Sequence, residues 1–207
     1  AVKRYKALEE GSSQVISVDI SKVDAANNGK LVHVTGNATT NESLSDASFG
    51  VTASAIKLVR QVEMFQWKEN TKSKSEKKLG GGKKTVKTYT YEKTWSNGLI
   101  SSSNFKKSAN HTNPASMPYE STTYKAKNVS LGSYSLSPSL ISGINKSETL
   151  DVDTLPSHLT NVQIHNNGYY IGFNPQTPAV GDVRITYKVV KPQIVSVVSK
   201  QNGHTFE

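Results

Sequence analysis

The side chains best suited to chemistry in this sequence are a few histidines, and their spacing is poor for catalysis or metal binding. His158 and His165 lie seven positions apart, and His111 stands alone in the segment ANHTNPASM. Zinc sites need three or four ligands at characteristic short spacings. The chain contains no Cys, which excludes thiol nucleophiles and thiolate ligands, and no G-x-S-x-G segment that would hold a reactive serine. We therefore expect no enzyme activity, no metal and no cofactor.

Glu63 is the acidic residue with the most apolar neighbours, because it stands between Val62 and Met64. A carboxylate in such surroundings can act as a general acid or base. Buried carboxylates are more often structural and paired with a cation. We interpret Glu63 as a structural residue that pairs with Arg60 or a lysine.

A lysine-rich segment over residues 70–84, NTKSKSEKKLGGGKK, contains Leu79 as its sole apolar side chain. The net charge of +9 permits attraction to anionic lipid or nucleic acid. Runs of charge usually stay solvated, so the favoured interpretation is a flexible hairpin loop rich in Lys and Gly. Contact of this basic loop with an anionic membrane surface is the alternative.

Aromatic residues alternate with lysines in KTYTYEKTW, where Tyr89, Tyr91 and Trp95 share one face with Lys87 and Lys93. Such a face could stack single-stranded bases above a basic groove. Sheets also need these residue types for packing. We favour packing, and we expect no nucleic-acid partner.

Two long strands can position these side chains. Residues 56–67 place Glu63, Phe65 and Trp67 on one face of a strand. Residues 85–95 form the second strand of an extended hairpin, in which Phe65 or Trp67 should lie opposite Tyr89 or Tyr91.

The remaining sequence predicts short elements that alternate with turns. The predictions are a helix over residues 1–11, a hairpin or meander of strands 16–20 and 31–35, a helix after Ser137, and strands 168–173, 181–190 and 193–201. The predicted fold class is mainly β (β-rich α+β), with an antiparallel barrel-like or sandwich-like sheet, a long hairpin and two or three short helices. We expect residues 1–207 to form a single domain.

Several segments resemble the transmembrane protein 43 (LUMA) family. They are NNGKLVHVTG, LSDASFGV running into AIKLVRQVEMFQWKE, YTYEKTWSNGLISSSNFKKSANHTNPASMPYES, VGDVRITYKVV and VSVVSKQNG. They occur in the same order from about residue 9 to the C-terminus, and VEMFQW, NHTNPASM and GDVRITY are the most specific. The match weakens in the Lys/Gly segment and in INKSETLDVDTLPSHLT.

The resemblance implies that the chain is an extracytoplasmic domain excised from an integral membrane protein. It implies a periplasmic position for a bacterial member, and the lumen of the endoplasmic reticulum or nuclear envelope for a eukaryotic one. The family is regarded as organising membrane protein complexes through protein-protein interaction and oligomerisation, without enzymatic activity. Its implied partners are other membrane proteins and a second copy of itself. The candidate interaction residues within the matched segments are Glu63, Phe65, Trp67, Trp95, Asn113, Pro114 and Asp182.

Two other functions remain open from the sequence. One is a basic β-barrel that binds single-stranded nucleic acid or a glycan. The more remote one is an uncharacterised hydrolase.

Overall fold

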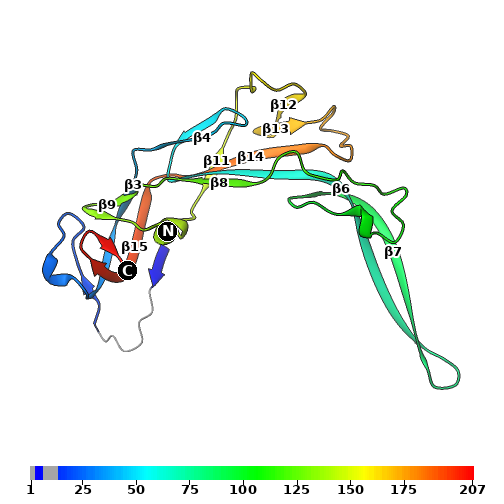
Figure 1. Ribbon diagram of the computed structural model, residues 1–207, viewed down its shortest axis with the longest axis horizontal. Helices are drawn as coiled ribbons and strands as arrows, with labels where there is room; N and C mark the ends of the chain where they lie inside the picture. Colours follow the sequence, from blue (N-terminus) through cyan, green and yellow to red (C-terminus); the bar gives the residue numbers. More distant parts are fainter. Residues whose placement is uncertain (1–2, 7–13) are drawn as a thin grey trace. The chain divides into compact units, whose positions relative to one another are not determined.

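The structure is a computed structural model that describes residues 3–6 and 14–207 (Figure 1). The fold class is mainly β, as predicted, with largely antiparallel strands, a long hairpin and few short helices. Contacts divide the chain into two compact units. Unit 1 comprises Ala1–Arg60, Thr122–Leu150 and Tyr187–Glu207, and unit 2 comprises Gln61–Ser121 and Asp151–Thr186. The single-domain organisation stays a prediction. Two strands, described below, run through both units.

The first sheet belongs to unit 1 and has the order β1-β15-β3-β9-β10, with β16 beside β15 and β2 beside β3. Its strands are β1 (Lys3–Lys6), β2 (Ile16–Ser17), β3 (Leu31–Thr39), β9 (Ser130–Leu131), β10 (Tyr134–Ser135), β15 (Gln193–Asn202) and β16 (Thr205–Phe206). The antiparallel pair β3–β15 forms its centre. Val32, Val34, Val195 and Val197 are buried there, since alternate residues of a strand point to the same face.

Unit 1 also contains smaller elements that do not belong to this sheet. They are the turn η1 (Ala25–Asn27), the hairpin strands β4 (Ser43–Asp46) and β5 (Val51–Ser54), β8 (Thr122–Lys125), the helix α1 (Pro138–Ser142) and β11 (Glu148–Leu150). The helix begins and ends as predicted. Ser137 caps it by accepting a hydrogen bond from the Leu140 amide, Pro138 occupies the first turn, and Gly143 closes it.

The second sheet has the order β12-β13-β14-β6-β7, with β11 beside β14 and β8 beside β6. Its remaining strands are β6 (Lys57–Lys77), β7 (Lys83–Ser96), β12 (Val162–His165), β13 (Gly168–Ile171) and β14 (Val183–Val190), and the turn η2 (Ser102–Asn104) follows β7. The division between the units falls within β6 and within β14. In unit 2, Val62, Met64, Val183 and Ile185 form the buried face of this sheet.

Two N-terminal predictions are wrong. The helix expected over residues 1–11 is contradicted at Lys3–Lys6, which form β1 and pair in parallel with β15. Residues 1–2 and 7–11 of that stretch lie outside the described residues. The strands expected to form a hairpin are β2 and β3, and they pair in parallel, with Ile16 beside Val32. Parallel pairing requires a long connection rather than a tight turn. The turn at Asn27 and Asn28 therefore serves that connection.

The long hairpin of β6 and β7 is confirmed, but its strands extend further than expected (Figure 1). Residues 70–77, predicted as loop, belong to β6, and residues 83 and 84 belong to β7. The turn is therefore limited to residues 78–82. The register also differs from the predicted aromatic pairs. Phe65 lies opposite Trp95, Trp67 opposite Lys93, and Tyr89 and Tyr91 opposite polar residues of β6.

Candidate interaction face

In unit 2, one face of β6 is buried and the opposite face is half-exposed. The half-exposed face carries the predicted aromatic residues. Glu63, Phe65 and Trp67 are half-buried, whereas Val62, Met64 and Gln66, which alternate with them, are fully buried. The two-residue period of a strand produces this separation. We use the term outer face for Glu63, Phe65, Trp67, Trp95 of β7 and Arg184 of β14.

An ion pair and two ring contacts connect the outer face across three strands. Arg184 Nε donates to Glu63 Oε1 at 2.9 Å, and both side chains are about two-fifths exposed. The Arg184 guanidinium lies 4.4 Å from the centroid of the Trp95 ring. Trp95 in turn contacts Phe65 with 5.2 Å between ring centroids. The arginine is therefore held over an indole ring while its carboxylate partner binds Nε, and its side chain stays partly exposed.

The partner of Glu63 corrects the sequence interpretation. Glu63 was expected to pair with Arg60 or a lysine, yet its cation is Arg184 from β14. Arg60 points to the opposite face of β6 and pairs with Asp46. Residues 60 and 63 differ by an odd number of positions, so they project from opposite faces of a regular strand.

Asp182 supports the outer face from the start of β14. Its Oδ2 accepts hydrogen bonds from the Tyr170 hydroxyl at 2.6 Å and from the Ala179 amide at 3.0 Å. Burial, together with the bond to this carboxylate, raises the pKa of Tyr170 far above its ordinary value. The phenol therefore stays protonated and serves as a fixed donor, and its ring meets Trp95 edge-on.

Asn113 continues the hydrogen-bond ladder of β6 beyond the residues that precede the neighbouring strand β14. Phe65 exchanges backbone hydrogen bonds with Asp182 and Gly181, at 2.9 and 2.8 Å. Two residues further on, the Trp67 amide donates to Asn113 Oδ1 at 2.7 Å, and Asn113 Nδ2 donates to the Trp67 carbonyl at 2.9 Å. The side-chain amide thus replaces a peptide group, because it offers one donor and one acceptor in the same plane.

Pro114, next to Asn113, packs close to the same turn. A methyl group built on Gly181 would lie 3.5 Å from its ring. Gly181 has a φ of 98°, which a glycine adopts without steric cost. Pro114 thereby lies against the turn that precedes Asp182 and β14.

The segment after β7 covers the base of the hairpin next to the outer face. His111 stacks on Tyr91 with 3.8 Å between ring centroids and meets Trp67 edge-on at 4.8 Å. The Tyr91 hydroxyl donates to Glu69 at 2.8 Å. Lys93 lies 4.9 Å from the Trp67 ring centroid. His111 therefore has a packing role here, with its Nδ1 at 2.8 Å from the Lys107 carbonyl oxygen.

A shallow pocket of about 170 Å³ lies beside Arg184 in unit 2. Its lining residues are Trp95, His165, Asn166, Tyr169, Tyr170, Pro175, Arg184, Ile185 and Thr186. Phe173 precedes Pro175 by two residues and is almost fully exposed, at 97%. An arginine, a tryptophan and tyrosines around one concavity are typical of energetically dominant interface residues.

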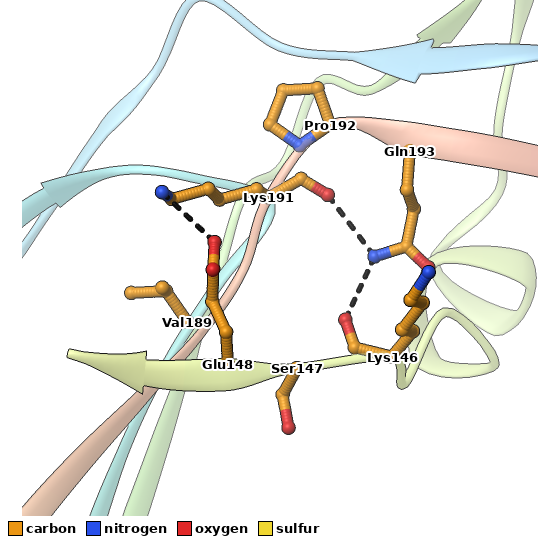
Figure 2. Close-up of a pocket in the computed structure, with 7 residues that line it drawn as sticks. All are labelled: Lys146, Ser147, Glu148, Val189, Lys191, Pro192 and Gln193. Carbon is orange, nitrogen blue, oxygen red and sulfur yellow. Dashed lines mark hydrogen bonds and ion pairs between the residues drawn. The ribbon is translucent and has the colours of Figure 1, made fainter.

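A second pocket, of about 300 Å³, lies in unit 1 between β11 and the β14–β15 connection (Figure 2). Figure 2 shows that its polar groups already bind one another. Lys191 pairs with Glu148 at 2.9 Å, and Gln193 Nε2 donates to the carbonyls of Lys146 and Lys191. We interpret these bonds as the closure of a strand connection.

The seven residues predicted from the sequence all lie in unit 2, and contacts link them through β6. Their role in binding stays a prediction. Sequence reasoning missed Arg184 and Tyr170, although the alternation in GDVRITY placed Arg184 on the polar side of its strand. It also missed the buried Asp46 in unit 1. In the described part of the chain, no three His, Asp or Glu side chains gather as metal ligands.

Within residues 3–6 and 14–207, no helix has the length and apolar character needed to cross a bilayer. Curated relatives nevertheless carry transmembrane names. Transmembrane protein 43 of Rattus norvegicus is 35% identical over 214 residues, which cover 98% of this chain and 53% of the relative. Transmembrane protein 43 of Homo sapiens is 33% identical over the same shares. The Drosophila melanogaster homolog is 29% identical and covers 99% of this chain and 55% of its own length.

The chain therefore spans about half the length of these relatives. No solved structure matches it. The family described as Transmembrane protein 43 matches residues 64–207, which include every residue of the outer face except Glu63. This match covers well over half of the sequence and confirms the resemblance noted from its segments: the chain belongs to the transmembrane protein 43 family.

Proposed function

We propose that this chain is a non-enzymatic interaction domain of a membrane protein, and that it helps to organise membrane protein complexes. In the complete protein it would lie on the non-cytoplasmic side, in the periplasm or in the lumen of the endoplasmic reticulum or nuclear envelope. Its partners would be other membrane proteins or a second copy of the chain. Family membership supports the association with membranes.

One observation carries the proposal of an interaction role. Arg184 is held between Glu63 and the Trp95 ring at the edge of a pocket, and Phe173 stands exposed nearby in the sequence. An arginine already ordered by its neighbours loses little conformational freedom when a partner binds. The exposed aromatic ring of Phe173 offers a large apolar contact.

The geometry favours a protein partner over a single-stranded nucleic acid. Base stacking requires open aromatic faces. Tyr91 has a face covered by His111, and Trp95 has Arg184 over its ring. A partner protein, in contrast, can use the exposed edge of the arginine and the ring of Phe173 together.

The proposal can be tested by site-specific photocrosslinking in the complete membrane protein. A benzophenone side chain at position 173 should give an adduct with a membrane protein or with a second copy. The same group at position 194 is the matched control, because Ile194 is also exposed, at 57%, but belongs to unit 1. Equal adducts at both positions, or none at position 173, would contradict a partner that contacts Phe173 in unit 2.

Arg184→Ala separates binding from folding in the same experiment. A half-exposed ion pair contributes only about 0 to 1 kcal/mol to stability, so the variant should keep its Tm within a few degrees. If Arg184 is an interface anchor, adduct formation should fall about tenfold or more. A large drop in Tm with an unchanged adduct would make Arg184 a structural residue.

A further inference from the structure

The outer part of the β6–β7 hairpin, residues 71–89, is ordered as two strands although it buries almost nothing. We use the term distal hairpin for this range. Cross-strand pairing continues from Thr71 opposite Tyr89 to Lys77 opposite Lys83. Every residue of β6 from Thr71 outward is exposed, as are residues 83–88 of β7. A two-stranded ribbon without a core has little stability of its own. We therefore expect a contact outside the unit to stabilise a ribbon of this length.

The charge of the distal hairpin identifies the chemistry of that contact. Residues 72–87 contain seven lysines and a single acidic residue, Glu76. Lys77 and Lys83 lie directly opposite each other at the end of the ladder. Like charges in opposite positions destabilise a strand pair. An anionic surface would remove this repulsion, so the charge pattern fits an anionic partner.

The turn at the end of the ribbon adds an apolar side chain to the basic surface. Leu79 is fully exposed, at 108%, and follows Lys78 directly. Gly80 and Gly81 have φ values of 115° and 97°, which keep the turn narrow. A leucine at a tip surrounded by lysines matches a bilayer interface, where apolar side chains enter the acyl boundary and long cationic side chains reach the headgroups. A nucleic-acid backbone has no comparable place for an exposed aliphatic side chain.

We propose that the distal hairpin binds the surface of a bilayer that contains anionic phospholipids. Leu79 enters the headgroup boundary, and Lys77, Lys78, Lys83 and Lys84 contact the anionic headgroups. The ribbon from Trp67 to Lys77 spans about 35 Å at roughly 3.3 Å per residue, which gives the tip a long reach. The proposal goes beyond the proposed function and uses no residue of the outer face. Either proposal can therefore fail without the other.

Vesicle cosedimentation of the purified 207-residue chain tests this proposal. The chain should bind vesicles of phosphatidylcholine mixed with phosphatidylserine, should not bind pure phosphatidylcholine, and should dissociate in high salt. Replacing Lys77, Lys78, Lys83 and Lys84 together by Gln should weaken binding roughly 600-fold, since each lysine near an anionic surface contributes roughly a fivefold effect. The matched control replaces four exposed lysines of unit 1 by Gln: Lys22, Lys30, Lys127 and Lys146.

The outcomes separate lipid binding from the alternatives. Loss of binding in the hairpin variant alone supports the proposal, whereas equal loss in the control variant would indicate diffuse charge attraction and overturn it. Binding of a single-stranded oligonucleotide that depends on the four hairpin lysines, with no binding to vesicles, would assign the ribbon to nucleic acid. If the parent chain does not bind vesicles and the hairpin variant aggregates, the proposal is overturned. The lysines would then serve to prevent aggregation through an exposed strand edge.

A second variant tests the role of the tip. Leu79→Trp places a fluorophore at the end of the ribbon, and its emission should shift to shorter wavelength when anionic vesicles are added. Trp67 and Trp95 provide the background, which the parent chain measures. An unshifted emission at full vesicle binding would contradict entry of residue 79 into the bilayer boundary.

Discussion

Asp46 is the clearest case of a single residue that organises its surroundings in unit 1. Its carboxylate is fully buried, and Arg60 Nη1 donates to both oxygens at 2.9 and 3.0 Å. The hydroxyls of Tyr187 and Tyr124 donate to it at 2.6 and 2.9 Å. These partners come from β14, β6 and β8. One carboxylate thereby joins four strands, including its own β4, and the buried charges of Asp46 and Arg60 compensate each other.

The same contacts determine how Asp46 titrates. Burial alone would raise the pKa of Asp46, but the hydrogen bonds from Tyr187, Tyr124 and Arg60 outweigh burial and leave the pKa below its ordinary value of 3.8. In the unfolded chain the carboxyl returns to that ordinary value. The ionised form is therefore bound more favourably in the fold, and its contribution to stability is present above about pH 4 and disappears as the pH falls through the lowered pKa.

We predict that Asp46→Asn reduces the free energy of unfolding by about 3 kcal/mol at neutral pH, because it leaves the Arg60 guanidinium buried without its counter-charge. The difference between the parent chain and the variant should shrink as the pH falls below the ordinary carboxyl pKa of 3.8 and through the lowered pKa of folded Asp46, because the parent carboxylate then also becomes protonated. Urea unfolding measured from neutral pH down to about pH 3 gives both quantities. Asp151→Asn, at an exposed position, should change stability by less than about 0.5 kcal/mol. A constant difference at all pH values would show that Asp46 does not titrate in this way.

At the scale of elements, the β12–β13 hairpin depends on a tight two-residue turn. Asn166 and Asn167 have φ values of 48° and 64°, which correspond to a turn of type I′ between His165 and Gly168. The next residue, Gly168, has to be a glycine because a Cβ at this position would clash with the Ile185 carbonyl oxygen of β14. This close approach holds β13 against β14, and β13 in turn delivers Tyr170 to the pocket beside Arg184.

We predict that Asn167→Ala destabilises unit 2 by about 1 to 2 kcal/mol, because alanine is strained at a positive φ. Asn167→Gly should be neutral or slightly stabilising, since glycine adopts this conformation freely. The side chain is exposed, so neither change affects packing. Thermal unfolding of the two variants measures the difference, and equal Tm values for Ala and Gly would contradict a turn of this type.

At the scale of the whole molecule, β6 and β14 connect the two units covalently through continuous strands. Each strand contributes residues to both units. β6 pairs with β8 in unit 1 and with β7 in unit 2, so unfolding of one unit releases one end of a strand that is still paired in the other. This continuity should make unfolding cooperative across the chain.

We predict a single unfolding transition for the whole molecule. Both tryptophans, Trp67 and Trp95, lie in unit 2, whereas Asp46 lies in unit 1. Asp46→Asn should therefore shift the midpoint of tryptophan fluorescence and of far-ultraviolet circular dichroism by the same amount. An unshifted fluorescence midpoint would show that the two units unfold independently.

Local patterns in the sequence determined much of this protein before any tertiary information. The alternation of residues 56–67 predicted β6 and its two faces, and the order of Ser137, Pro138 and Gly143 predicted α1 with its ends. The family resemblance was equally available, because it rests on the order of specific segments. These features depend on residues near one another in the chain, where spacing alone specifies which side chains share a face.

The tertiary structure decided which distant residues meet. Arg60 pairs with Asp46 on one face of β6 and Glu63 with Arg184 on the other, and β2 lies parallel to β3. These outcomes follow from strand order and register, which bring Glu63 and Arg184 together although they are 121 positions apart. Periodicity says that a side chain faces a sheet neighbour, but it carries no information about which strand that neighbour belongs to.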